Sequence, residues 1–344
     1  MAPGKRFAIL DSLRGLLLIL MTIDHLGGPL GTFFFERFGF WSAAEGFFFL
    51  SGFVTTRIAF RKEEHAASWI CKRAGKVWIW HALSVFAVSS IAVWLGHFGW
   101  RDAPGLEALE ANPMHLFATL ALIHLPDFLD VLPLYVILLL TSSIIIPWVI
   151  RKAARVRTAL IFWGGSAIVW LLAQFHCWDL LRGGLPAWMH PGVFDPMGWQ
   201  FIFFSGSSLA LVLRSTQLPR PSRLLPWLIL PIFFLLWRNG LLPLAVPTDE
   251  NAWASRNHLG LLRILSFFSL VWIVVLPLRN KASHFTWAFP SLIGRNSLQV
   301  FTWHLPLVYL WIYRPRQASL FWEIAVPLLV VLSLAIPAWW REKT

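Results

Sequence analysis

Long apolar runs, separated by short polar or basic segments, follow one another along the whole chain. Most of these runs approach the roughly 20 residues that a helix needs to cross the hydrocarbon core of a bilayer. The pattern predicts an all-α polytopic membrane protein with about ten transmembrane helices in one bundle, so that residues 1–344 form a single integral membrane domain. The predicted spans are residues 13–30, 39–60, 77–95, 132–150, 158–175, 197–213, 224–237, 260–278, 298–313 and 320–340.

The segment 114–125 is apolar but only about a dozen residues long, which is too short to cross a bilayer unaided. We expect it to be re-entrant or to lie at the membrane surface. With this segment left out, both termini are cytosolic and 21 of the 29 Lys and Arg residues lie on the cytosolic side, as the positive-inside rule requires. Counted as a span, it would move the basic segment 151–157 and all later loops to the other side. The charge distribution therefore favours ten spans.

The composition agrees with a membrane protein: 57% of the residues are hydrophobic, only 13% are charged, and 22 are Trp. A net charge of +12 is explained by basic cytosolic loops, and nucleic acid is not an expected partner. The two cysteines, Cys71 and Cys177, fall at opposite predicted membrane faces, so we expect no disulfide.

The first apolar run contains three ionisable side chains, Arg14, Asp24 and His25. Charges at membrane depth are costly and are usually kept for a pathway or a reaction. Arg14 and His25 are eleven positions apart, which brings both to one helix face about 16 Å apart along the axis. A lone histidine in a helix bundle is more often a packing residue, but its depth, the adjacent Asp24 and the aligned Arg14 favour a functional role for His25.

A neutral imidazole that a carboxylate orients can take a proton from a hydroxyl group, as the transfer of an acyl group to an alcohol requires. Asp24 is one candidate for the orienting carboxylate, although adjacent helical residues diverge by about 100°. Glu45 on the second span is the other. Glu45, Gly52 and Thr56 share one face of that span, which predicts a close packing seam, a catalytic carboxylate, or both.

A basic hairpin is predicted between the second and third spans on the cytosolic side. Its charges have an ordinary explanation as topology anchors that meet anionic lipid headgroups. Their spacing at two adjacent helix ends also suits an anion with several phosphates, such as the nucleotide of coenzyme A. The candidate ligands of that anion are Arg14, Arg57, Arg61, Arg73 and Lys76.

Polar residues near the predicted outer surface are candidates for binding a sugar acceptor. Asp130 with Tyr135, and Asp195 before Pro196, could accept hydrogen bonds from hydroxyl groups, but capping of a helix is the favoured interpretation for both acids. His304 shares a helix face with Ser297 and is expected to orient substrate or to support the structure rather than to act as a second base.

Several segments resemble the acyltransferase-3 superfamily of membrane acyltransferases. The opening helix is similar in residues 10–15 (LDSLRG) and in the ten residues between Arg14 and His25. The second span is similar in residues 44–53 (AEGFFFLSGF), with glutamate where that superfamily commonly has aspartate. The basic pair before the third span and the segment 295–304 also match its pattern.

The resemblance is closer to the OpgC-like branch, which is associated with succinylation of osmoregulated periplasmic glucans. The segments that carry it are residues 21–29 (MTIDHLGGP), 130–135 (DVLPLY) and 194–196 (FDP). It implies a multi-pass protein of the bacterial inner membrane in which cytosolic acyl-CoA, as succinyl-CoA or acetyl-CoA, modifies a periplasmic glycan. His25 would be the catalytic base and Arg14 would contact the donor. No metal is expected, and a homo-oligomer in the lipid bilayer stays open.

Two other classes of protein fit the same charged residues. A non-enzymatic carrier or flippase for an anionic lipid or glycan precursor could line its pathway with Arg14 and His25. A sensor could bind acyl-CoA without turnover. Formation of an ester on the glycan distinguishes the enzyme from both.

Overall fold

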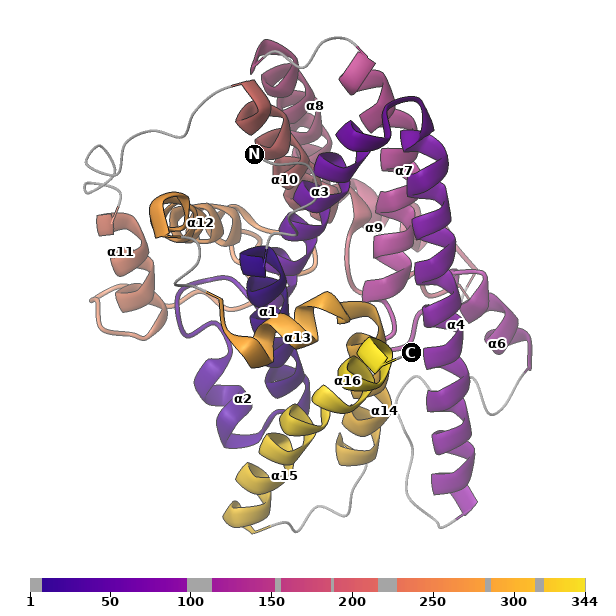
Figure 1. Cartoon of the computed structure of the whole chain (residues 1–344). Helices are drawn as coiled ribbons and strands as arrows, with labels where there is room; N and C mark the ends of the chain where they lie inside the picture. Colours follow the sequence, from indigo (N-terminus) through magenta and orange to yellow (C-terminus); the bar gives the residue numbers. More distant parts are fainter. Residues whose placement is uncertain are drawn as a thin grey trace. The chain divides into compact units, whose positions relative to one another are not determined.

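The computed structural model describes residues 8–97, 113–151, 156–186, 189–215, 228–281, 286–312 and 319–343. Every regular element in this part of the chain is a helix (Figure 1). In chain order they are α1 (Ala8–Leu26), α2 (Gly28–Phe34), α3 (Ala43–Lys62), the 3₁₀ turn η1 (Glu63–His65), α4 (Ala66–His97), α6 (Pro113–Leu120), α7 (Val131–Arg151), α8 (Val156–Gln174), α9 (Cys177–Gly183), α10 (Pro196–Ser215), α11 (Ile229–Arg238), α12 (Leu261–Lys281), α13 (Ala288–Arg295), α14 (Ser297–Ile312), α15 (Leu320–Ser333) and α16 (Ala335–Lys343).

Five helical segments of the described chain are long and apolar enough to cross a membrane. The described part of the chain is therefore all-helical and has the apolar helices of a membrane protein, while the count of ten spans and the cytosolic termini stay predictions. The opening helix α1 is not among the five because three charged residues, Asp11, Arg14 and Asp24, lie within its 19 residues. The five segments are Ala43–Ile91, Val131–Arg151, Val156–Gln174, Pro196–Leu213 and Leu320–Lys343.

The chain forms two compact units, each built from separate stretches of sequence. Unit 1 comprises Met1–Phe47, Pro219–Val246 and Ile264–Thr344, and unit 2 comprises Phe48–Leu218 and Pro247–Arg263. We describe each unit by itself.

In unit 1, α1 packs against α2, α13, α14 and α15. The closest approach is to α13, where Gly15 faces the carbonyl of Pro290, and Gly294 faces the carbonyl of Asp11. A methyl group at either glycine would overlap these backbone atoms. The backbone of Trp287 also donates a hydrogen bond to Ser12 Oγ at 3.2 Å. Two glycines, one on each helix, thus allow direct backbone contact between α1 and α13.

The ends of two predicted spans differ from the sequence analysis. The first helix ends at Leu26 rather than at residue 30, because Gly27 and Gly28 both adopt positive φ (65° and 67°) and lead into the short helix α2. The last predicted span, 320–340, is two helices, α15 and α16. Pro337 lies in the first turn of α16 and cannot donate to the carbonyl four residues earlier, which explains the break at Leu334.

The sequence analysis also missed α13, which precedes the span predicted at 298–313. In the structure Gly294 and Arg295 end α13, and Asn296 separates it from α14. The Asn296 side chain donates to the carbonyl of Leu292 at 3.1 Å, so it satisfies one of the last carbonyls of α13. The span predicted at 224–237 lies partly outside the described residues, and its described part, α11, has only 10 residues.

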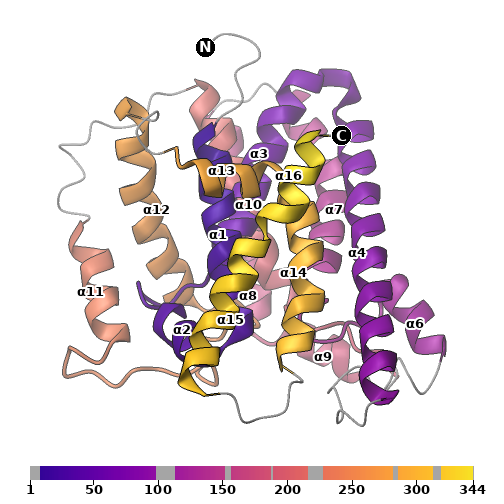
Figure 2. The same cartoon turned by 60° about the horizontal axis from the view of Figure 1, so that its bottom comes forward.

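In unit 2, α4 packs against α7, and α8 packs against α10 (Figure 2). Gly52 on α3 faces the carbonyl of Phe203, and Gly206 on α10 faces the carbonyl of Phe49, so these helices also touch backbone to backbone. Ser207 Oγ donates to the Gly52 carbonyl at 3.3 Å. The predicted packing seam at Gly52 is therefore present.

The basic segment between the second and third predicted spans is helical, not a hairpin loop. α4 begins at Ala66, eleven residues before the predicted span, and the chain turns at η1 instead. Lys72, Arg73 and Lys76 therefore project from the first turns of α4. Hydropathy marks only the apolar part of a helix, whereas Ala, Lys and Arg extend it. The segment 114–125 contains the eight-residue helix α6, which is too short to cross a bilayer, as expected.

We expect Gly15→Ala to destabilise the protein, because the added methyl group would force α1 and α13 apart. Overpacking of this kind costs about 1–3 kcal/mol. The matched control is Gly164→Ala on α8, where a methyl group has no heavy atom within 4 Å. Thermal unfolding in detergent measures both, and a Gly15→Ala variant as stable as the control would contradict the close contact.

Candidate functional site

Helix α1 carries Arg14 and His25, which the sequence analysis placed on one helix face. Arg14 and His25 are both half-buried and lie on one uninterrupted helix, so their spacing of about 16 Å along the axis holds. Leu17, Leu18 and Met21 on the same helix are buried in unit 1. The apolar side chains therefore fix α1, and the two ionisable residues keep partial access.

The ring of His25 lies against the ring of His304 on α14. His25 Nδ1 and His304 Nε2 are 3.2 Å apart, the ring centroids are 5.4 Å apart, and the two ring planes differ by 24°. His304 is buried, with 1% of its surface exposed. Its other nitrogen, Nδ1, lies 2.7 Å from the carbonyl oxygen of Phe301. The partner that the structure gives to the His25 Nδ1 atom is thus another histidine.

The hydrogen-bond network assigns the tautomers of this pair. A carbonyl oxygen can only accept, so His304 Nδ1 carries the hydrogen and donates it to Phe301. In the neutral ring, His304 Nε2 is then an acceptor, and His25 Nδ1 donates to it. A neutral His25 therefore has its lone pair on Nε2, which is the nitrogen that can act as a base.

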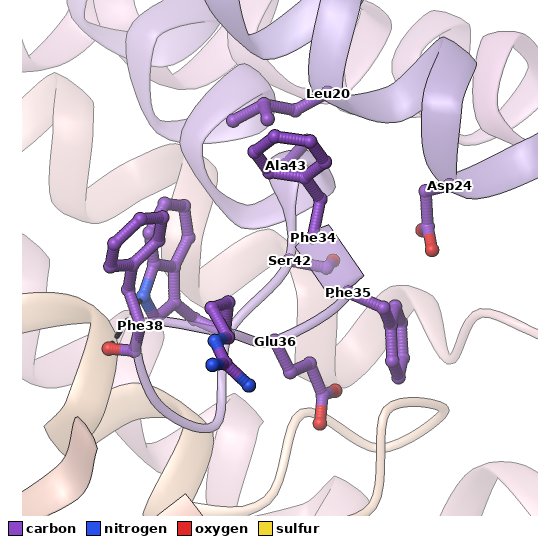
Figure 3. Close-up of a pocket in the computed structure, with 10 residues that line it drawn as sticks. Leu20, Asp24, Phe34, Phe35, Glu36, Phe38, Ser42 and Ala43 are labelled. Atoms are coloured by element: carbon purple, nitrogen blue, oxygen red, sulfur yellow. Dashed lines mark hydrogen bonds between the residues drawn. The ribbon is translucent and has the colours of Figure 1, made fainter. Parts of the chain in front are cut away.

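The carboxylate of Asp24 lines a different surface of α1. It belongs to a pocket with Leu20 of α1, the end of α2 and the loop that leads to α3 (Figure 3). Phe34, Phe35 and Ser42 line the same pocket. The pocket includes Glu36, whose carboxylate accepts from Arg238 Nε at 2.9 Å. Since adjacent helical residues diverge by about 100°, Asp24 faces this pocket while His25 faces α14.

Glu45, the other predicted orienting carboxylate, binds the residue that precedes α3. It is fully buried, and its Oε2 accepts from the backbone N of Ser42 at 2.9 Å and from Ser42 Oγ at 2.6 Å. A glutamate that reaches back to the backbone N of the residue before the helix makes one of the two hydrogen bonds of a capping box. The sequence contains this signal as Ser42 followed three residues later by Glu45, and the sequence analysis overlooked it.

The predicted donor-binding residues fall in both units. Arg57, Arg61, Arg73 and Lys76 belong to unit 2, and Arg14 belongs to unit 1, so their common anion site stays a prediction. Arg61 and Lys76 are exposed, whereas Arg57 and Arg73 are half-buried.

Arg73, which was predicted to bind acyl-CoA, contacts Tyr135, which was predicted to bind the sugar acceptor. Its Nε and Nη2 donate to Tyr135 Oη at 3.1 and 2.7 Å, and Tyr135 is buried with 3% exposed. Because α4 packs along α7, this guanidinium is turned toward the neighbouring helix while Lys76 faces outward. Two residues that were predicted for different substrates are therefore joined by hydrogen bonds.

Of the two predicted outer acids, Asp195 has the contact of the helix-capping alternative, whereas the Asp130 side chain contacts the loop at Val193. Asp195 Oδ1 accepts from the backbone N of Met197 at 2.7 Å, at the start of α10. Asp130 precedes α7, is 4% exposed and accepts from the backbone N of Val193 at 3.4 Å. Burial is the main cause that raises the pKa of Asp130, to about 7.

A further group of polar residues lies in unit 2 and was missed by the sequence analysis. Asp195 Oδ2 lies 3.2 Å from His258 Nδ1, and this hydrogen bond raises the pKa of His258 above its ordinary value. His258 Nε2 in turn lies 3.2 Å from Asp179 Oδ2, which is also 2.8 Å from His176 Nδ1. The spacing of His176 and Asp179 by three residues was the available sequence signal. Among the described residues, this is the group with donor atoms close enough to hold a metal ion.

Comparison with known proteins identifies the family of the whole chain. A model of the OpgC protein family matches residues 6–344. No curated protein and no solved structure matches the chain.

The raised pKa of Asp130 predicts that the protein loses stability as the pH rises from about 4 to about 7. Over this range the folded protein keeps a proton on Asp130 that the unfolded chain releases near its ordinary value of 3.8. The full effect is on the order of 4 kcal/mol. Asp130→Asn should remove it while keeping an acceptor for Val193.

The measurement is the unfolding temperature in detergent between pH 5 and pH 8. Asp130→Asn should unfold at a clearly higher temperature than the wild type at pH 8, and the difference should be small at pH 5. Glu64→Gln, at an exposed position in η1, serves as the control with the wild-type profile. Parallel profiles for wild type and Asp130→Asn would show that Asp130 is not protonated in the folded state.

Proposed function

The chain belongs to the OpgC protein family, and on that premise we propose that it is a membrane acyltransferase that modifies osmoregulated periplasmic glucans. The acyl donor in this proposal is cytosolic acyl-CoA, as succinyl-CoA or acetyl-CoA, and the acceptor is a hydroxyl group of the glucan. The protein would work in the bacterial inner membrane. The five long apolar helices support a membrane location.

One observation carries the assignment of the base: the contact of His25 Nδ1 with His304 Nε2 at 3.2 Å. It holds His25 in the tautomer whose Nε2 has the lone pair. In the reaction, Nε2 takes the proton of the glucan hydroxyl as the oxygen attacks the thioester carbonyl carbon. The carbon–sulfur bond then breaks, the coenzyme A thiolate takes that proton from Nε2, and the ester remains on the glucan.

His304 takes the place that a carboxylate holds in the familiar catalytic triad. As Nε2 of His25 gains a proton, its Nδ1–H becomes a stronger donor, and the lone pair of His304 Nε2 stabilises the developing charge. His304 itself is held by the carbonyl of Phe301. It acts through His25 and is therefore a positioning residue, whereas the sequence analysis expected it to orient substrate or to support the structure.

The remaining predicted residues are assigned to the two substrates. Arg14, Arg57 and Arg61 are proposed to contact the phosphates of the donor, because guanidinium groups bind phosphate with two hydrogen bonds. Lys76 is exposed and would add charge. Arg73, which is half-buried and hydrogen-bonded to Tyr135, would add a further positive charge to these basic residues. Asp195 would affect the acceptor through the start of α10, and Asp130 through its contact with the backbone N of Val193.

We expect His25→Ala to lower acyl transfer to the glucan by about 10²–10⁴-fold, the usual contribution of a general base. His304→Leu should lower kcat strongly and leave the KM for acyl-CoA unchanged, whereas His304→Asn, which keeps an acceptor, should lose less. His65→Ala, at an exposed histidine in η1, is the matched control. Transfer is measured with purified protein, labelled acyl-CoA and glucan, followed by mass spectrometry of the product.

Each outcome of this experiment has a clear meaning. Normal ester formation in His25→Ala would remove His25 as the base. A wild-type protein that forms no ester but moves an anionic lipid or glycan precursor between vesicle leaflets would be a carrier. Binding of acyl-CoA without either activity would identify a sensor.

Arg14→Ala is expected to raise the KM for acyl-CoA with little change in kcat. A contact with the donor phosphates is equally strong in the ground state and the transition state, so its loss affects binding alone. Lys343→Ala, at the exposed end of α16, is the control for the loss of a positive charge. An unchanged KM in Arg14→Ala would exclude Arg14 from the donor site.

A further inference from the structure

Three side chains of unit 2 converge where α9 meets the loop before α12. His176 precedes α9, Asp179 lies in its first turn, and His258 belongs to the loop. One donor atom from each lies within 4.8 Å of the other two. The two imidazoles approach the same carboxylate oxygen, Asp179 Oδ2, from two different segments of the chain.

The distances within this group suit a small divalent cation. His176 Nδ1 and His258 Nε2 lie 2.8 and 3.2 Å from Asp179 Oδ2. Tetrahedral zinc, with bonds of about 2.0–2.1 Å, places neighbouring donor atoms about 3.3 Å apart. A zinc ion could therefore replace the hydrogens between the two imidazoles and Asp179, with small movements of the side chains.

The backbone that presents His258 is held in place before any ion binds. Four consecutive carbonyls of the loop 256–259 each accept a hydrogen bond from the neighbouring helices or their ends. The donors are Trp199 Nε1 to residues 256 and 257, the backbone N of Asp195 to residue 257, Gln174 Nε2 to residue 258, and Trp170 Nε1 to residue 259. Gly198 has no side chain, and a methyl group there would overlap the backbone of His258. The ligand is thus preorganised.

The backbone of His176 is strained in the way that functional positions often are. This residue adopts φ 56° and ψ 26°, a left-handed conformation that costs a side chain other than glycine of order 1 kcal/mol or more. The conformation turns its ring against that of His258, with centroids 4.7 Å apart. The structure thus places both rings together at some cost in local energy.

Asp195 supplies the support that metal-binding histidines commonly have. Its carboxylate is fully buried, and Oδ2 lies 3.2 Å from His258 Nδ1, the nitrogen that faces away from the group. A carboxylate on this nitrogen fixes the tautomer and makes the other nitrogen a better ligand. The second oxygen, Oδ1, accepts from the start of α10, so the carboxylate cannot turn.

We propose that His176, Asp179 and His258 bind a zinc ion, with Asp195 as the orienting carboxylate behind His258. Two imidazoles and one carboxylate are typical zinc ligands, whereas calcium and magnesium require oxygen ligands. Three protein ligands leave one tetrahedral position for water or an anionic oxygen. The half-exposed side chains of His176 and Asp179 open this position to solvent. The ion joins α9 to the loop before α12, which differs from the expectation of no metal.

The test uses the full chain in detergent, with an affinity tag that contains no histidine, after treatment with a chelator. Calorimetric titration with zinc chloride should show one site per chain, and cobalt(II) should give the visible absorption bands of a low-coordinate ion. His176→Ala and Asp179→Asn should each weaken zinc binding about tenfold or more. Their altered side chains are largely exposed, so the apo variants should unfold at the wild-type temperature. His65→Ala should bind zinc like the wild type.

Asp195→Asn distinguishes an orienting role from simple support of the fold. The amide keeps an oxygen for the start of α10 but can present its NH₂ group to His258 Nδ1. The hydrogen of the neutral ring would then move to Nε2 and block the ligand position. Zinc affinity should fall about 10–100-fold, and the cobalt spectrum should weaken in parallel.

The proposal is overturned if chelator-treated wild type binds no zinc. It is also overturned if His176→Ala and Asp179→Asn bind zinc as tightly as the wild type, since the ion would then occupy other residues.

Discussion

The direct contact between the backbones of α1 and α13 determines where His304 lies relative to His25 in unit 1. Inside a bilayer, helices are not driven together by the hydrophobic effect, so close packing and hydrogen bonds hold them. Gly15 and Gly294 provide such packing, each facing a carbonyl of the other helix. A single residue separates the end of α13 from the start of α14. His304 lies two helical turns after the start of α14. The approach of two glycine-bearing helices thus leads, through a short turn, to the meeting of His304 with His25. The same device, with Gly52 and Gly206, joins α3 to α10 in unit 2.

Buried carboxylates and imidazoles have different tasks in this molecule. Glu45 and Asp195 both satisfy backbone N–H groups at the start of a helix, where an anion is favoured by the helix dipole. The imidazoles, which need no charge, meet each other directly at His25 and His304. In the proposed mechanism, a neutral histidine orients the base without the cost of placing another anion among apolar helices. Where acids and histidines do combine, around His258, the group lies between helices at a partly exposed position.

Local patterns predicted much of the fold and part of the site. The apolar runs gave the position of α3, α7, α8, α10, α12 and α14 to within a few residues at most ends, because helix formation and hydropathy are local properties. The eleven-residue spacing correctly placed Arg14 and His25 on one helix. Short helices such as α2, α9 and α13 were missed, since they are too brief to leave a periodic signal. The basic start of α4 was also missed, because hydropathy does not detect a charged helix.

The sequence by itself determined that this chain is a helical membrane protein and which ionisable residues lie within its apolar segments. The partners of those residues were decided only by the tertiary structure. His25 and His304 are 279 positions apart, Arg73 and Tyr135 are 62 apart, and Asp195 and His258 are 63 apart. The reason is physical: helical periodicity fixes the direction of a side chain within its own helix, whereas the point at which two helices cross depends on packing along their whole length. No local spacing contains that information, so only the folded chain places Asp24 at a pocket and Glu45 at the start of α3.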